Sequence, residues 1–199
     1  MIDVETSVGT ARVHLHAAGS GKGALVLGHG AGGGVQAPDL VAVTRAAVEL
    51  GIDVALVEQP YRVLGRRSPP PAPRLDTAWT EVVERLRAEE LAGLPLVAGG
   101  RSSGARVACR TAGLLRAAGV LCLAFPLEPP SGRASRLAEL EAVEVPVLVV
   151  QGEHDRFGIP PPAPGRSVVV VGGDHALRKD AGAIAAAARD WLRELFAAA

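Results

Sequence analysis

Short apolar runs alternate with longer segments of helical spacing along most of this chain. The run at residues 24–27, for example, precedes a helical pattern over 38–50, and the run at 96–99 precedes another over 103–118. Parallel strands need long crossover connections, which are usually helices, so this alternation indicates a mostly parallel sheet with helices on both faces. The predicted fold class is therefore α/β.

The two ends of the chain add further elements. Residues 12–16 alternate between polar and apolar side chains, which predicts an edge strand paired antiparallel with residues 2–5. Apolar runs at 147–151 and 167–171 predict two more strands. The Ala-rich segment 181–196 predicts a closing helix whose apolar stripe could also support a homodimer.

Prolines divide the middle of the chain. Residues 62–74 contain four prolines and are expected to form a surface loop, because proline removes a backbone donor and fixes φ. We expect the next helix to be capped by Asp76 or Thr77 and to run to about Leu91. Residues 125–132 are expected to form a second proline-rich loop.

Composition excludes several classes of protein. The chain has 199 residues, with 21 Lys and Arg against 21 Asp and Glu, so its formal net charge is zero. No excess charge attracts phosphate backbones or anionic lipid, and neither a membrane span nor a signal peptide is recognisable, so we expect a cytoplasmic protein without nucleic-acid or membrane partners. We expect one domain over residues 1–199.

The two cysteines do not indicate a metal site. Cys109 and Cys122 lie inside apolar segments without the spacing of metal ligands, so we expect buried free thiols. Nothing else in the sequence calls for a metal or another cofactor, and none is expected.

The candidate chemistry begins at a serine between a strand and a helix. Gly100, Ser102 and Gly104 fit the pattern G-x-S-x-G directly after the run at 96–99 and directly before the helix over 103–118. Glycines at these positions permit a sharp turn and close packing of strand and helix, so the serine hydroxyl stands clear of the sheet. The backbone N–H of Ser103 would face a developing oxyanion.

Two later loops supply the partners that a nucleophilic serine needs. Asp155 follows the strand at 147–151, and His175 follows the strand at 167–171. His175 would accept the proton of Ser102, and Asp155 would orient the imidazole. The order serine, acid, histidine is typical of one fold, the α/β-hydrolase fold.

With these motifs, the chain resembles the α/β-hydrolases, and especially the small dienelactone-hydrolase-like group without a cap domain. The resemblance rests on GGRSSG, VLVVQGEHD, GGDHAL and LGHGAGG, and it extends over nearly the whole chain. It implies Ser102 as nucleophile, Asp155 as acid and His175 as base. It also implies that the second oxyanion donor is the backbone N–H of Ala31, with Gly32 as the alternative.

Several neighbouring residues allow more than one reading. Glu153 could replace Asp155 as the acid, whereas Asp174 suits a turn. His29 is expected to orient the oxyanion loop, and His154 to lie at the rim of the site. Arg101 could contact an acidic group of the substrate or pack its stem along the helix. We expect the substrate site to include the following residues: Gly30, Gly32, Arg101 and Phe125.

The expected activity is hydrolysis of a small-molecule ester or thioester through an acyl-enzyme. Only residues 125–146 separate the strand after Ser102 from the strand before Asp155, which leaves room for a loop and a short helix near 135–140. The site should therefore be open and suit short-chain or bulky, exposed esters. Amide, peptide or lactone cleavage on the same machinery is an alternative. Another is a non-catalytic binding or scaffold module, because some relatives of this group resemble scaffold parts.

Overall fold

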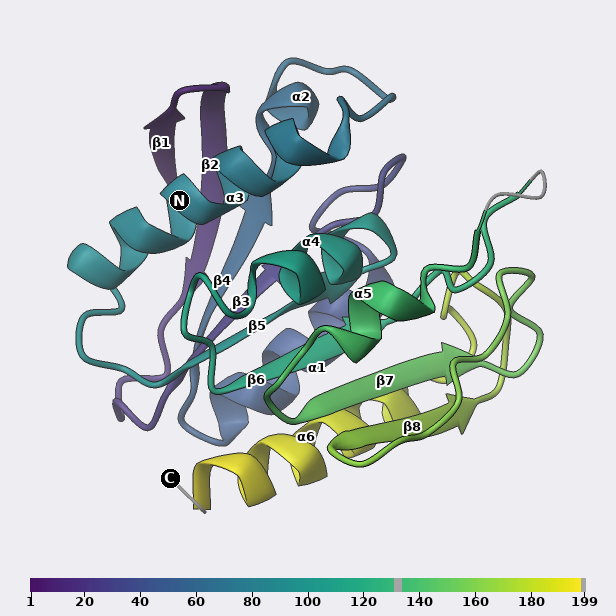
Figure 1. Cartoon of the computed structure of the whole chain (residues 1–199). Helices are drawn as coiled ribbons and strands as arrows, with labels where there is room; N and C mark the ends of the chain where they lie inside the picture. The colour runs from purple at the N-terminus through teal and green to yellow at the C-terminus, as the bar shows by residue number, and fades with distance from the viewer. Residues whose placement is uncertain (131–133, 198–199) are drawn as a thin grey trace.

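The computed structural model describes residues 1–130 and 134–197 and contains a central eight-stranded sheet (Figure 1). Its strand order is β1-β2-β4-β3-β5-β6-β7-β8. Strands β3 to β8 run parallel to one another, whereas β2 pairs antiparallel with both β1 and β4. The strands are β1 (Ile2–Thr6), β2 (Gly9–His16), β3 (Ala24–Gly28), β4 (Asp53–Glu58), β5 (Leu96–Arg101), β6 (Gly119–Leu123), β7 (Val147–Gly152) and β8 (Arg166–Val171).

Helices cover both faces of this sheet, which confirms the predicted α/β architecture (Figure 1). Helices α1 (Pro38–Glu49) and α6 (Ala181–Ala197) pack on one face. Helices α3 (Ala72–Ala88), α4 (Ser103–Thr111) and α5 (Leu137–Glu141) pack on the other. None of the helices in the described ranges is long and apolar enough to cross a membrane.

The buried strands contribute side chains to two separate hydrophobic clusters, because successive side chains of a strand point to opposite faces of the sheet. In β3, Ala24 and Val26 belong to the cluster under α3 and α4, whereas Leu25 and Leu27 belong to the cluster under α1 and α6. All four side chains are fully buried. This explains why β3 reads as a continuous apolar run in the sequence.

The apolar stripe of α6 is used within the chain. Leu192 is fully buried in the cluster under α1 and α6, and Trp191 and Leu195 pack against the same cluster. The two cysteines are buried and free, as predicted, with their sulfur atoms 3.5 Å apart.

Two helix boundaries differ from the sequence prediction. Helix α3 begins at Ala72, not at Asp76 or Thr77, because Pro73 occupies the first turn, where a missing N–H costs nothing. Helix α4 ends at Thr111, several residues before the predicted end, and Arg116 then adopts a left-handed φ of 49°.

The proline-rich loops also contain unpredicted detail. The start of the expected loop at 62–74 is helical, since the short helix α2 spans Pro60–Val63. In the second loop, residues 131 and 132 lie outside the described residues. The expected short helix in the connection from β6 to β7 is present as α5.

Strand β3 and the turn between β5 and α4 approach each other more closely than side chains would allow. A Cβ atom on Gly100 would lie 2.5 Å from the carbonyl oxygen of Gly28, and a Cβ on Gly104 would lie 2.5 Å from the same carbonyl group. Gly100 also adopts φ of 157°, which side chains disfavour. The two outer glycines of the serine motif are therefore required by packing.

Replacing Gly104 by alanine is expected to lower the free energy of unfolding by at least about 3 kcal/mol, since the new methyl group meets backbone that cannot move away cheaply. Gly113→Ala is the matched control, because a Cβ there has no atom within 4 Å, and its effect should stay within about 0.5 kcal/mol. Chemical denaturation measures both. Equal stability of the two variants would contradict the close approach described above.

Candidate active site

The carboxyl ends of three parallel strands bring together the serine, aspartate and histidine singled out in the sequence. Ser102 follows β5, Asp155 follows β7, and His175 follows β8. The Nε2 atom of His175 lies 3.0 Å from the Oγ of Ser102, and its Nδ1 atom lies 2.8 Å from Oδ2 of Asp155. This is the relay in which a histidine can accept a hydroxyl proton while a carboxylate holds its second nitrogen.

Ser102 has the strained backbone of a sharp strand-to-helix turn, with φ of 51° and ψ of −106°. Its N–H donates to the carbonyl of Leu123 in the neighbouring strand β6, at 2.9 Å, which holds the turn in place. Ser103 is the first residue of α4, so its N–H has no acceptor within the helix. This N–H is therefore available to an oxygen atom held beside Ser102.

The Asp155 carboxylate is fully buried and held from three sides. Besides His175, it accepts a hydrogen bond from the N–H of Phe157 at 2.9 Å and one from Nε2 of Gln151 at 2.7 Å. Gln151 is completely buried at the end of β7 and was not predicted as part of the site. A polar residue inside an otherwise apolar strand was the only signal for it in the sequence.

Glu153, His154 and Asp174 do not take the place of Asp155 beside His175. The side chain of Glu153 is 50% exposed and accepts from the N–H of Gly173, so Asp155 is the carboxylate that contacts His175. His154 is exposed, in keeping with a place at the rim. Asp174 accepts from the N–H of Ala176, as expected of a turn residue.

An aromatic ring packs against the catalytic candidate His175. The ring of Phe157 meets the imidazole edge-on, with the ring centroids 4.5 Å apart and an interplanar angle of 71°. The guanidinium of Arg156 lies over the ring of Phe157, 4.8 Å from its centroid. Phe157 was not foreseen from the sequence, because only the folded loop places it beside the histidine.

His29 holds the loop that contains Gly30 by hydrogen bonds. Its Nδ1 lies 2.8 Å from the carbonyl oxygen of Gly30, and its Nε2 accepts from the N–H of Gln59 at 3.1 Å. This pair of partners requires the neutral ring with hydrogen on Nδ1. Burial lowers the pKa of His29, which favours the same neutral form.

The predicted oxyanion donor Ala31 is held through its carbonyl group. The hydroxyl of Tyr61 donates to that carbonyl at 2.8 Å, and burial raises the pKa of Tyr61 to about 12, so the phenol remains a donor. Among the described residues, no protein group accepts a hydrogen bond from the N–H of Ala31. Gly32 is exposed in the same loop.

From the sequence we expected Arg101 to contact the substrate or to pack along the helix. In the structure it contacts Asp39 and the carbonyl of His175. Its Nε lies 2.9 Å from Oδ2 of Asp39, and its Nη2 donates to the carbonyl of His175 at 2.7 Å. Its Nη1 also packs on Gly30, where a Cβ would lie 2.9 Å away, and Gly30 itself is buried. Arg101 thus joins α1, the oxyanion loop and the histidine loop.

Asp39, the partner of Arg101, is completely buried at the start of α1. Burial raises the pKa of its carboxyl group, and the positive charge of Arg101 opposes that shift. A buried pair of this kind is costly to break, because the remaining charge has no water to solvate it.

Phe125, which we expected in the substrate site, lies in the hydrophobic core. Its side chain is fully buried in the cluster under α3 and α4, and its carbonyl accepts from Nε2 of Gln151 at 3.0 Å. The preceding residue, Ala124, has a φ of 48°, so the chain leaves β6 through a turn that the sequence pattern did not reveal.

The arrangement of Ser102, His175 and Asp155 supports covalent catalysis by a serine. In the part of the chain that the structure describes, no group of three or more His, Cys, Asp or Glu side chains is placed to hold a metal. The available chemistry is a hydroxyl, a histidine base, a buried carboxylate and two free backbone N–H groups.

Comparison with known proteins gives a consistent picture. A family model described as alpha/beta hydrolase domain matches residues 21–183. No curated protein sequence matches the chain.

Solved structures show the same fold at low sequence identity. A lidless α/β serine hydrolase from Xanthomonas campestris is 20% identical, with 97% of this chain and 93% of that chain covered and a TM-score of 0.77. Est1E from Butyrivibrio proteoclasticus, bound to ferulic acid, is 14% identical, with 99% and 100% covered and a TM-score of 0.81. Dienelactone hydrolase from Anabaena variabilis is 15% identical, with 97% and 95% covered and a TM-score of 0.76.

Replacing Arg101 by methionine is expected to lower the free energy of unfolding by about 3–5 kcal/mol in neutral buffer, because Asp39 is left buried without its cation. The loss should shrink in mildly acidic buffer. A carboxyl group whose pKa is raised by folding contributes stability below its unfolded pKa and loses it as the pH rises through the folded pKa.

Denaturant unfolding at two pH values measures this effect. The double variant Asp39→Asn with Arg101→Met should regain much of the lost stability, since neither charge remains. If Arg101→Met loses no stability, or loses the same amount at both pH values, the ion pair with Asp39 does not stabilise the fold in this way.

Proposed function

The chain belongs to the α/β-hydrolase family, and on that basis we propose that it is a serine hydrolase that cleaves an ester or thioester bond through an acyl-enzyme. The observation that carries the proposal is the continuous relay from the Oγ of Ser102 through His175 to the buried carboxylate of Asp155. The strained turn that presents Ser102 supports it, because such strain persists where the surrounding structure enforces it for function.

In the acylation step, the Oγ of Ser102 attacks the substrate carbonyl while Nε2 of His175 takes the hydroxyl proton. The carbonyl oxygen becomes an oxyanion, which accepts hydrogen bonds from the N–H groups of Ser103 and Ala31. As the tetrahedral intermediate collapses, the bond to the alcohol or thiol breaks, and the imidazolium of His175 protonates that leaving group. Asp155 holds the imidazole orientation and stabilises its positive charge.

Deacylation repeats the same proton movements with water. His175 takes a proton from the water molecule as its oxygen attacks the acyl carbonyl, and the proton then passes to the Oγ of Ser102 as the acyl–oxygen bond breaks. The products are a carboxylic acid and the free enzyme. Gln151 and Phe157 support this cycle indirectly, because both donate hydrogen bonds that fix the Asp155 carboxylate.

The surroundings of the site favour small, exposed esters. Between β6 and β7, the described residues contain only the short helix α5, and a structural neighbour is described as lacking a lid. Phe157 offers one aromatic wall beside His175. Another neighbour was solved with ferulic acid, a compact aromatic acid, which is consistent with a substrate carrying a short or aromatic acyl group.

A fluorophosphonate probe is expected to label wild-type protein, because the activated Oγ of Ser102 attacks phosphorus much as it would attack a carbonyl. Labelling should disappear in Ser102→Ala and fall at least about a hundredfold in rate in His175→Ala, which lacks the general base. Gel fluorescence and intact mass measure the label. Ser167→Ala, which removes an exposed serine from β8, is the control and should label normally.

The proposal fails if folded wild-type protein stays unlabelled under conditions that label a known esterase. That result would favour a non-catalytic binding or scaffold module. Labelling that survives in Ser102→Ala would place the reactive group elsewhere.

A panel of p-nitrophenyl esters of increasing acyl length is expected to give the highest kcat/KM with short acyl chains and a decline with long ones, because an open site offers little buried surface for a long chain. Initial rates of nitrophenolate release measure this, with Ser102→Ala as the background control. Preference for long acyl chains would contradict the open-site account. Faster cleavage of matched amides or lactones would assign the machinery to those bonds instead.

A further inference from the structure

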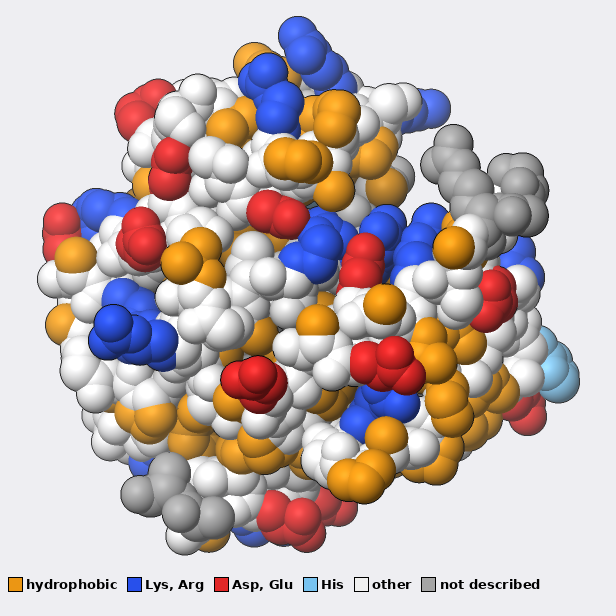
Figure 2. Space-filling view, viewed as in Figure 1, with side chains coloured by type: hydrophobic (Ala, Val, Ile, Leu, Met, Phe, Trp, Pro, Cys, Tyr) orange, Lys and Arg blue, Asp and Glu red, His pale blue; other side chains and the backbone are white. Residues whose placement is uncertain are grey.

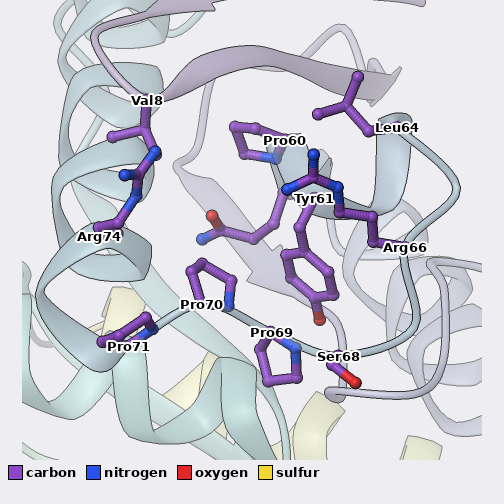
Figure 3. Close-up of a pocket in the computed structure, with 11 residues that line it drawn as sticks. Val8, Pro60, Tyr61, Leu64, Arg66, Ser68, Pro69, Pro70, Pro71 and Arg74 are labelled. Carbon is purple, nitrogen blue, oxygen red and sulfur yellow. The ribbon is translucent and has the colours of Figure 1, made fainter.

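A pocket lies beside α2 and is lined in part by Tyr61, whose hydroxyl donates to the carbonyl of Ala31 (Figure 3). Its volume is about 290 Å³, close to the lower end of the range for small-molecule sites, about 300–1,000 Å³. Pro60, Tyr61 and Leu64 from α2 and its end form one side, and the segment from Ser68 to Pro71 forms another. None of the residues proposed for catalysis lines it.

Prolines supply much of the apolar part of this pocket's wall. Four prolines line it, at positions 60, 69, 70 and 71, and each has a fixed φ. Tyr61 is anchored through its hydroxyl to Ala31, and Gln59 donates from Nε2 to the carbonyl of Leu75 at 3.1 Å. A preformed pocket of this kind loses little conformational entropy when a ligand binds.

The charge of the pocket is entirely positive. Arg66 and Arg74 are its only charged lining residues, and Figure 3 shows their guanidinium groups on opposite sides of it. Within the described ranges neither arginine forms an ion pair with Asp or Glu. Two guanidinium groups over an apolar wall are suited to an anion with an apolar body.

The surrounding sequence strengthens this local charge. Residues 59–75 contain four arginines and no Asp or Glu, although the chain as a whole has equal numbers of acidic and basic residues. The flanking acids are already engaged, since Glu58 lies 3.2 Å from His14 and Asp76 pairs with Arg110 at 2.6 Å. Figure 2 shows basic side chains over α2 and the segment after it, with hydrophobic side chains between them.

We propose that this pocket binds a small organic acid, with its carboxylate paired to Arg66 and Arg74 and its compact apolar or aromatic body against the prolines and Tyr61. The apolar walls distinguish this ligand from a bare phosphate, which has no group to place there. Because the pocket does not contain Ser102, the proposal does not depend on the hydrolase activity.

Titration of the isotope-labelled protein with sodium benzoate at fixed ionic strength tests the proposal by NMR. Saturable shifts are expected at the backbone amides of Val8, Tyr61 and Leu64, all of which line the pocket. Benzyl alcohol, which has the ring without the charge, and inorganic phosphate, which has charge without the ring, should each bind at least about tenfold more weakly. One lost charge-assisted contact has an effect of that size.

Exposed arginines provide matched variants that should not disturb folding. Arg66→Gln and Arg74→Gln should each weaken benzoate binding about tenfold or more. Arg67→Gln removes an equally exposed arginine that does not line the pocket, and it should leave the affinity unchanged. Ser102→Ala should bind benzoate like the wild type, so failure of the proposed hydrolase activity and failure of this site give different results.

Four outcomes would overturn the proposal. These are absence of saturable shifts, equal weakening by Arg67→Gln, equal affinity for benzyl alcohol or phosphate, and shifts centred on the loops of Ser102 and His175 instead of on the pocket.

Discussion

The close backbone approach between strand β3 and the turn that carries Ser102 is the constraint on which the geometry of the serine depends. Gly28, Gly100 and Gly104 meet there with no room for a Cβ on the last two. This contact lets α4 start directly at the end of β5, so the strained Ser102 faces the loops that follow β7 and β8. A bulkier residue would push the strand and helix apart and move the serine away from its histidine.

Buried polar contacts then fix the loops around that turn. Gln151 and the N–H of Phe157 hold Asp155, which in turn holds His175. Arg101 adds a second connection, because it pairs with buried Asp39 and donates to the carbonyl of His175. His29 and Tyr61 hold the proposed oxyanion loop through hydrogen bonds to the carbonyl groups of Gly30 and Ala31. The proposed catalytic atoms therefore rest on contacts from both sides of the sheet edge, which is the preorganisation that acyl transfer needs.

The parts of this arrangement that depend on local pattern were predictable, and the parts that depend on distant contacts were not. Apolar runs and glycine spacing predicted the α/β sheet and the placing of Ser102, Asp155 and His175 after three strands. The start of α3 was missed because Pro73 fits a first turn as well as a loop. The partner of Arg101 lies far away in the sequence, in α1, and Phe125 turns into the core through a residue with positive φ. No local pattern reveals either.

The central claim is that Ser102 carries the acyl group during turnover. Rapid acid quenching after mixing with p-nitrophenyl acetate, followed by mass analysis of the digested protein, tests this directly. The account predicts one acetyl group on the peptide that contains Ser102, formed as nitrophenolate is released and lost again as the substrate is exhausted. Steady release of nitrophenolate with the acetyl group on another residue, and none at any time on the Ser102 peptide, would contradict it.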